Sequence, residues 1–157
     1  MQRKKLPIGI QSLREIREEG HYYVDKTPLA LQLIAQGKYF FLSRPRRFGK
    51  SLFLDTLKEL FEGNQALFAG LYAEKNWDWS RQHPVLRFSF GGGVLGSVAD
   101  LQDSLHAQLT RHEESCGLPT KYPDARSRFS ELIVHLATTT GQRVVVLIDE
   151  YDKPILD

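Results

Sequence analysis

The chain has 157 residues, enough for one domain of ordinary size with a substantial buried core. It is 41% hydrophobic and 25% charged, which is typical of a globular protein, and its net charge of +2 is too small to indicate nucleic-acid or membrane binding by itself. The single cysteine, Cys116, excludes an internal disulfide and a zinc site built from cysteines, and it favours a reducing compartment.

The sequence contains no stretch that suggests a membrane-spanning segment or a signal peptide. The longest strongly apolar stretch is VVVLI at 144–148, which is far too short to span a bilayer. The N-terminal residues are basic but lack the apolar run of a signal peptide. We therefore expect a soluble, cytoplasmic protein without a membrane partner.

Two short helices are predicted first. Ser12 and Glu15 have the spacing of a capping box, and Gly20 closes the helix that they open. Thr27 followed by Pro28 predicts a second helix start, with the threonine hydroxyl as N-cap and the proline in the first turn. This second helix is expected to run to about residue 36 and to stop at the following glycine.

A strand, a loop and a helix come next. The run KYFFLS at 38–43 is apolar and short, and it predicts a buried strand. Residues 50–63 predict a strong helix that Gly63 ends. The residues expected on its apolar face are Phe53, Leu54, Leu57, Leu60 and Phe61.

The second half of the chain repeats this alternation. Residues 84–90 predict a strand, Ser97 starts a helix, residues 125–137 predict another helix, and residues 143–149 predict a strand. Apolar strands that alternate with helices indicate a parallel sheet in an α/β fold. We treat residues 1–157 as one domain of this class.

The stretch SRPRRFGKSL at 43–52 lies between the predicted strand and helix. It resembles the phosphate-binding pattern G-x-x-x-x-G-K-[ST], with Arg44 in place of the first glycine. In that pattern Gly49 permits close backbone approach, Lys50 reaches the β- and γ-phosphates, and Ser51 binds Mg²⁺ through its hydroxyl. The alternative is a helix N-terminus with a solvated lysine.

The arginines of this loop carry separate expectations. Arg44 suggests that the first turn of the loop does not need the positive φ that glycine supplies. Arg46 and Arg47 are placed either along a triphosphate or against acidic groups elsewhere, and a solvent-facing position is an equal alternative for Arg46.

The stretch VVVLIDEYD at 144–152 is a predicted strand that ends in two carboxylates. Asp149 is positioned to hold Mg²⁺ opposite the loop serine, and Glu150 to orient and deprotonate an attacking water. The alternative is a strand that exits into solvent. The two motifs occur in the order, and at the strand ends, that a Walker A and Walker B pair requires, which favours a nucleotide site.

Four stretches together resemble the AAA-ATPase-like domain family. They are YYVDKTPLALQLI, FLSRPRRFGKSLFLDTL, PVLRFSF and VVVLIDEYDKPI. This family consists of P-loop proteins, many of which carry a PD-(D/E)XK-type nuclease-like domain at the C-terminus. The resemblance covers nearly the whole chain, and RPRRFGKS is a specific hallmark that makes Arg44 a family feature.

The resemblance implies roles for individual residues. Lys50 and Glu150 are the implied catalytic residues, and Ser51 and Asp149 the implied Mg²⁺ ligands. The implied nucleotide-binding residues are Arg46, Arg47, Phe48, Gly49, Lys50, Ser51 and Leu52. The preference for ATP over GTP follows from the resemblance alone.

The motif YYVDKT at 22–27 also matches the family, but its role is open. Asp25 and Thr27 are interpreted as helix caps in preference to nucleotide contacts. Tyr22 or Tyr23 could pack near an adenine, although aromatic residues belong more often to a core.

The sequence stops soon after the acidic pair, so we expect an N-terminal portion of a longer protein, truncated after the Walker B strand. A later strand with a polar sensor residue, an arginine finger and any nuclease-like domain are missing from it. The strands at 38–43 and 143–148 would then lack the neighbour that joins them, and unpaired edges are a liability. The chain alone is therefore expected to be a poor ATPase.

The leading hypothesis is ATP binding, with Mg²⁺-dependent hydrolysis to ADP and phosphate in the intact protein. A second copy of the chain or another partner is expected to supply a catalytic arginine, and nucleic acid to enter only through an absent C-terminal domain. One alternative is a nucleotide-gated switch with little turnover. Another is a basic module in which Arg44, Arg46, Arg47 and Lys50 contact nucleic-acid phosphates.

Overall fold

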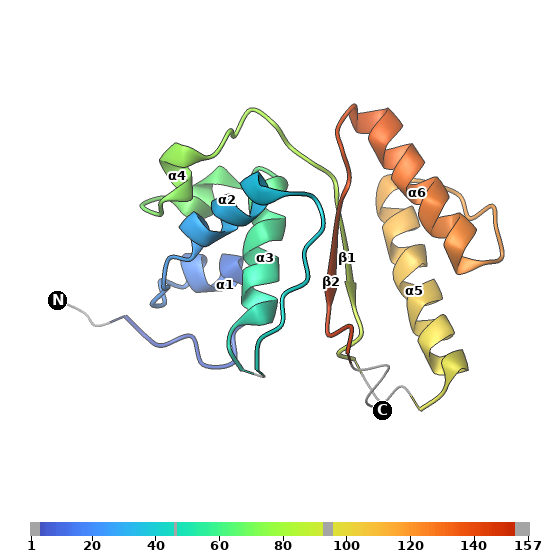
Figure 1. The fold of residues 1–157 in the computed structure, drawn as a ribbon, viewed down its shortest axis with the longest axis horizontal. Helices are drawn as coiled ribbons and strands as arrows, with labels where there is room; N and C mark the ends of the chain where they lie inside the picture. The colour runs from blue at the N-terminus through green and yellow to red at the C-terminus, as the bar shows by residue number, and fades with distance from the viewer. Residues whose placement is uncertain (1–3, 46, 93–95, 153–157) are drawn as a thin grey trace. The chain divides into compact units, whose positions relative to one another are not determined.

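The structure is a computed structural model that describes residues 4–45, 47–92 and 96–152. The chain divides into two compact units, Met1–Gln82 and His83–Asp157, and each is described by itself. Figure 1 traces the elements of both units along the chain.

The regular elements described in the first unit are all helical. They are α1 (Leu13–Glu18), α2 (Thr27–Gln36), α3 (Lys50–Phe61), the 3-10 helix η1 (Gln65–Phe68) and α4 (Ala73–Asn76). Their core is formed by Leu13, Leu60, Leu67, Phe68 and Ala73, against which Trp77 and Trp79 pack. Trp77 and Trp79 are therefore packing residues of this unit.

The predicted start of α1 is confirmed. The hydroxyl of Ser12 accepts a hydrogen bond of 3.3 Å from the backbone N–H of Glu15. Capping of this kind satisfies one of the backbone donors that the first turn of a helix leaves without a partner.

The predicted range of α2 is confirmed, but its predicted cap is wrong. The N-cap position belongs to Lys26, and the hydroxyl of Thr27 does not cap the helix. This hydroxyl donates to the carboxylate of Asp25 instead and accepts from the backbone N–H of Ala73, 46 residues later. The threonine therefore makes a long-range contact with α4, which rules for local capping do not predict.

The helix α3 begins at the predicted Lys50 and ends at Phe61, two residues earlier than predicted, and its inner face is partly polar. Asp55, Thr56 and Glu59 are buried beside the predicted Leu57 and Leu60. The Asp55 carboxylate accepts a hydrogen bond of 2.7 Å from the backbone N–H of Leu13, at the start of α1. Buried polar groups of this kind are tolerated because they are hydrogen-bonded.

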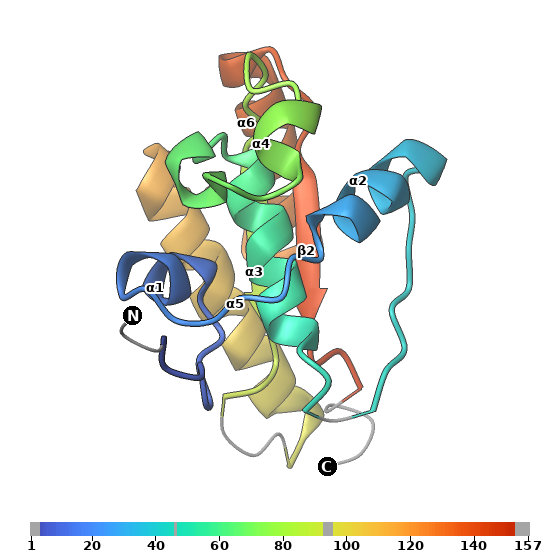
Figure 2. The ribbon, with the colours of Figure 1, turned by 90° about the vertical axis from the view of Figure 1, so that its left-hand side faces the viewer.

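The prediction of a buried strand at 38–43 is wrong. This segment carries no strand, and Tyr39 and Phe41 are 94% and 72% exposed. A strand is maintained by hydrogen bonds to a neighbouring strand. Since the described residues of the first unit contain no other strand, the apolar run has no sheet to join. In Figure 2 the chain leaves the end of α2 through this segment, which is drawn without a strand arrow.

The second unit is built from β1 (Val85–Ser89), α5 (Val98–Cys116), α6 (Ala125–Thr140) and β2 (Val145–Asp149). The two strands are parallel and hydrogen-bonded to each other, with Val85 opposite Val145 and Ser89 opposite Asp149. This confirms the coarser expectation of an α/β protein with a parallel sheet. Both helices lie on the same side of the strands in Figure 1.

The helices of the second unit begin where the sequence predicts. Ser97 caps α5 through a hydrogen bond from Asp100, and Asp124 caps α6 through one from Ser127. The core under these helices consists of Leu86, Phe88, Leu109, Leu118 and Leu132. Among the described residues, no helix combines the length and the apolar composition needed to cross a bilayer.

Candidate functional site

The loop before α3 has an unusual backbone. Gly49 is the N-cap of α3 and adopts a left-handed conformation with a φ of 76°, which glycine reaches without steric cost. Arg47 has a φ of 67°, a strained value for a residue with a side chain. Arg44 does not have a positive φ, which agrees with the expectation that the first turn of the loop does not need the conformation that glycine supplies. Arg46 lies outside the described residues.

The N-terminus of α3 is open to an anion. Side chains cap α1, α5 and α6, whereas none of the described side chains caps α3. The first backbone N–H groups of a helix have no partner within the helix, and the helix dipole adds positive potential at this end. An uncapped start after a left-handed glycine is the arrangement in which helices bind phosphate.

The ammonium group of Lys50 lies over the loop. Its Nζ donates hydrogen bonds to the backbone carbonyls of Arg44 at 2.6 Å and Pro45 at 3.5 Å. Neutral carbonyls are weaker acceptors for an ammonium group than charged oxygens are. The lysine is therefore held at the loop by bonds that a phosphate can replace.

The remaining residues of the motif differ in what they offer. Ser51 is partly buried in the first turn of α3, and its hydroxyl has no hydrogen-bond partner within the described ranges. The side chain of Leu52 packs against the core of the first unit, so this residue could contact a ligand at the loop only through its backbone. Phe48 is largely exposed.

A cavity of about 460 Å³ adjoins this loop within the first unit. Its charged lining residues are Lys26 from the start of α2, Arg44 from the loop and Lys50 from α3. No carboxylate is among the described residues that line it. Apolar side chains, including Leu29 and Phe53, line the rest.

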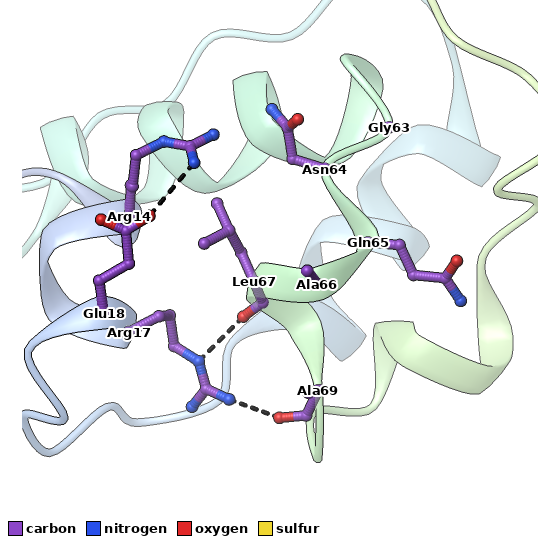
Figure 3. A pocket seen from close by; sticks show the side chains of 9 residues that line it. All are labelled: Arg14, Arg17, Glu18, Gly63, Asn64, Gln65, Ala66, Leu67 and Ala69. Atoms are coloured by element: carbon purple, nitrogen blue, oxygen red, sulfur yellow. Dashed lines mark hydrogen bonds and ion pairs between the residues drawn. The ribbon is translucent and has the colours of Figure 1, made fainter.

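A larger cavity of about 700 Å³ in the same unit has a different character. Figure 3 shows that Arg14 points to Glu18 and that Arg17 points to the backbone carbonyls of Leu67 and Ala69. Because these guanidinium groups already have acceptors, the larger cavity offers less to an anion than the cavity beside Lys50.

Asp149 ends β2 and is only 6% exposed. One carboxylate oxygen lies 3.6 Å from the guanidinium of Arg87 on β1, and the other accepts a hydrogen bond from the backbone N–H of Glu150. These two contacts orient the carboxylate at the C-terminal end of the strand pair.

Glu150 follows the strand in a left-handed conformation, with a φ of 52°. Its carboxylate lies against the backbone of Gly91, and a methyl group placed on this glycine would come within 2.6 Å of Oε2. A side chain at position 91 would therefore have to displace the Glu150 carboxylate. The exposed carboxylate thus lies just past the end of β1, close to Gly91.

The predicted ligands suit a magnesium ion in their chemistry. A serine hydroxyl and an aspartate carboxylate are hard oxygen donors, and Mg²⁺ keeps several waters in addition to a few such ligands. Ser51 belongs to the first unit and Asp149 to the second.

Sequence patterns did not identify two residues that the structure places beside predicted site residues. Arg87 is the one charged residue of β1, and a cation within an apolar strand is a signal that a nearby acid needs a partner. Lys26 lies in the YYVDKT motif, but nothing in the sequence spacing connects it with the loop before α3. Only the fold brings it to the cavity.

Comparison with known proteins gives a consistent result. A family described as "Predicted AAA-ATPase" matches residues 7–157. The chain is 60% identical over 158 residues to the "Uncharacterized protein in vnfD 5'region" of Azotobacter chroococcum mcd 1. The match covers all of this chain and 31% of that protein, so the chain spans about a third of the relative's length. No solved structure matches the chain.

Proposed function

Because the chain belongs to the AAA-ATPase-like family of predicted AAA-ATPases, we propose that it binds ATP and that the intact protein hydrolyses ATP with Mg²⁺. The family supports the general nucleotide-binding role. The observation that carries the finer proposal is the uncapped N-terminus of α3, with Gly49 in a left-handed conformation and the Lys50 ammonium over the loop. These are the parts of a phosphate-binding loop.

Binding follows from the groups at this loop. The backbone N–H groups at the start of α3 donate to phosphate oxygens, and Gly49 leaves room for their approach. Lys50 exchanges its carbonyl acceptors for phosphate oxygens, which accept charge-assisted hydrogen bonds. Arg47 and Phe48 border the phosphate chain, and Arg46 remains part of this proposal by its place in the motif.

Ser51 and Asp149 would hold the magnesium ion. A bound magnesium ion would supply neutralisation of the charge that develops on phosphate oxygens in such reactions. Arg87 has a separate task, because a buried carboxylate without a partner is costly. It balances Asp149 in the absence of a ligand.

Glu150 is proposed as the general base. Its carboxylate is exposed, so it is accessible to water, and the contact with Gly91 limits where it can lie. A positioned base takes the proton from the attacking water and contributes typically 10²–10⁴-fold to such reactions. We expect the remaining stabilisation to need an arginine from a second copy of the chain or another partner.

Binding is tested by titrating Mg²⁺–ATP into the 157-residue chain by calorimetry. Lys50→Ala is expected to lower the affinity at least tenfold, because charge-assisted hydrogen bonds are lost. Lys75→Ala is the matched control, since Lys75 is exposed and has no partner in the part of the chain that the structure describes. Equal affinities for the parent and Lys50→Ala would refute the proposed site.

Hydrolysis is tested separately by phosphate release. We expect slow turnover from this chain alone and a further decrease in Glu150→Gln, with ATP binding retained. Glu114→Gln, an exposed acid of the same unit, is the control. Undiminished turnover in Glu150→Gln would remove that residue from the role of base.

A further inference from the structure

We propose that Lys26 is a second phosphate-binding cation of the nucleotide site, contacting the polyphosphate chain together with Lys50. This inference rests on the proposed function and adds a binding residue to it.

Lys26 reaches the phosphate loop although it belongs to a different helix. A methyl group placed on Gly49 would lie 3.7 Å from the Lys26 ammonium nitrogen. Gly49 is the residue that lets a phosphate approach the backbone at the start of α3. A cation at this distance from it lies within reach of whatever the loop binds.

The neighbours of Lys26 in the chain hold its backbone in place. The Asp25 carboxylate accepts hydrogen bonds from the backbone N–H and hydroxyl of Thr27 and from the backbone N–H of Tyr72. Thr27 is fully buried and accepts from the backbone N–H of Ala73. The chain is therefore anchored to the start of α4 on both sides of Lys26.

The side chain of Lys26 is not used by this anchor. Within the described residues its ammonium group has no hydrogen-bonding or ionic partner. The anchored residues of the motif point their side chains to α4, while the lysine between them lines the cavity beside the loop. A fixed backbone that presents a free cation is pre-organised for a ligand, which reduces the ordering cost of binding.

The charge of the cavity indicates an anionic ligand. Lys26, Arg44 and Lys50 all line it, and none of its described lining residues is acidic. Cations that converge without counter-charges concentrate positive potential. The cavity beside Arg14 shows the opposite situation, because there each guanidinium has acceptors in the protein. A polyphosphate supplies the missing negative charge.

The experiment compares two probes, Mg²⁺–ATP and inorganic triphosphate, titrated by calorimetry into the 157-residue chain and its variants. Lys26→Ala is expected to bind both probes about tenfold more weakly than the parent, because one charge-assisted contact is lost. Lys26→Arg keeps the charge and is expected to recover most of the affinity. Lys75→Ala is expected to bind like the parent. Melting curves without ligand should be the same for all four proteins, since Lys26 is exposed and without a partner among the described residues.

Each other outcome has a distinct meaning. Parent-like affinity of Lys26→Ala, with binding lost in Lys50→Ala, would overturn the role of Lys26 and leave the nucleotide site standing. A loss for ATP but not for triphosphate would overturn the phosphate contact and assign Lys26 to the nucleoside. If Lys26→Arg bound the probes as weakly as Lys26→Ala, a role based on the charge of Lys26 would be contradicted. A parent that binds neither probe would overturn both the inference and the proposed function.

Discussion

The carboxylate of Asp25 accepts a hydrogen bond of 2.7 Å from the backbone N–H of Tyr72, which lies 47 residues later in the chain. Tyr72 is the N-cap of α4, so the aspartate satisfies a donor that this short helix leaves without an internal partner. Thr27 does the same for Ala73. The motif YYVDKT thus satisfies donors at two helix starts. Asp25 accepts from the backbone N–H of Thr27, the first residue of α2, and the motif also caps the distant helix α4.

Removing this anchor should affect both stability and binding. Asp25→Ala is expected to lower the free energy of unfolding by about 1 kcal/mol, the usual cost of losing a helix cap. It should also weaken Mg²⁺–ATP binding by less than Lys26→Ala does, because the cation remains but its backbone is less fixed. Denaturant titration and calorimetry measure the two effects. Asp103→Ala, an exposed acid in the second unit, should change neither. Full stability of Asp25→Ala would show that the anchor is dispensable.

A buried ion pair joins α5 to α6 and was not predicted. Arg128 donates to both carboxylate oxygens of Glu113, at 3.0 and 2.6 Å, and also contacts Thr110 and His106. Glu113→Gln would leave the buried guanidinium without its counter-charge, and breaking such a pair typically costs about 3–5 kcal/mol. Chemical unfolding should detect the loss. Glu114→Gln, at the adjacent exposed position, should leave the free energy of unfolding unchanged. If Glu113→Gln also left it unchanged, the ion pair would not contribute to stability.

The same pair predicts a pH dependence of stability. The hydrogen bonds from Arg128 lower the pKa of Glu113, although burial opposes this shift. A carboxyl whose folded pKa is below its unfolded value, about 4.3, stabilises the fold above that pH and loses this contribution as pH falls through the folded pKa. The unfolding free energy should therefore decrease below about pH 4 more steeply in the parent than in Glu113→Gln. Parallel curves from pH 5 to pH 2 would contradict the shift.

The contact between Gly91 and Glu150 offers a test of the proposed base. Gly91→Ala would bring a methyl group within 2.6 Å of the carboxylate and displace it. A displacement of about 1 Å can cost on the order of 100-fold in rate, so phosphate release should fall by 10- to 100-fold with ATP affinity unchanged. Gly92→Ala is the control, because a methyl group there meets no atom within 4 Å. Equal rates for the two variants would mean that the position of Glu150 does not limit hydrolysis.

Local signals predicted much of the fold. Ser12, Ser97 and the range of α2 were correct because caps and helical periodicity act over a few residues. Residues 38–43 failed for the opposite reason. An apolar run of six residues fits a buried strand, but pairing depends on a neighbour that the segment itself does not specify. In the structure this run is exposed.

The residues of the candidate site also fall into those that local sequence patterns identify and those that only the fold brings together. The motif types identified Gly49, Lys50, Asp149 and Glu150 because their spacing is itself the signal. Lys26 could not be found this way, because a hydrogen bond between Asp25 and a residue of α4 determines where the lysine lies. The partners of buried charges are likewise set by how distant helices and strands pack.

Trp77 and Trp79 make tryptophan fluorescence a probe of one of the two units. They are its only tryptophans, and both pack in the first unit, with Trp77 edge-on to Phe61 and Trp79 beside Phe68. Fluorescence excited at tryptophan therefore follows the unfolding of residues 1–82 alone, whereas far-ultraviolet circular dichroism follows the helices of both units. Coincident transitions would mean that the two units unfold cooperatively, and separated transitions would give each unit its own measurable stability.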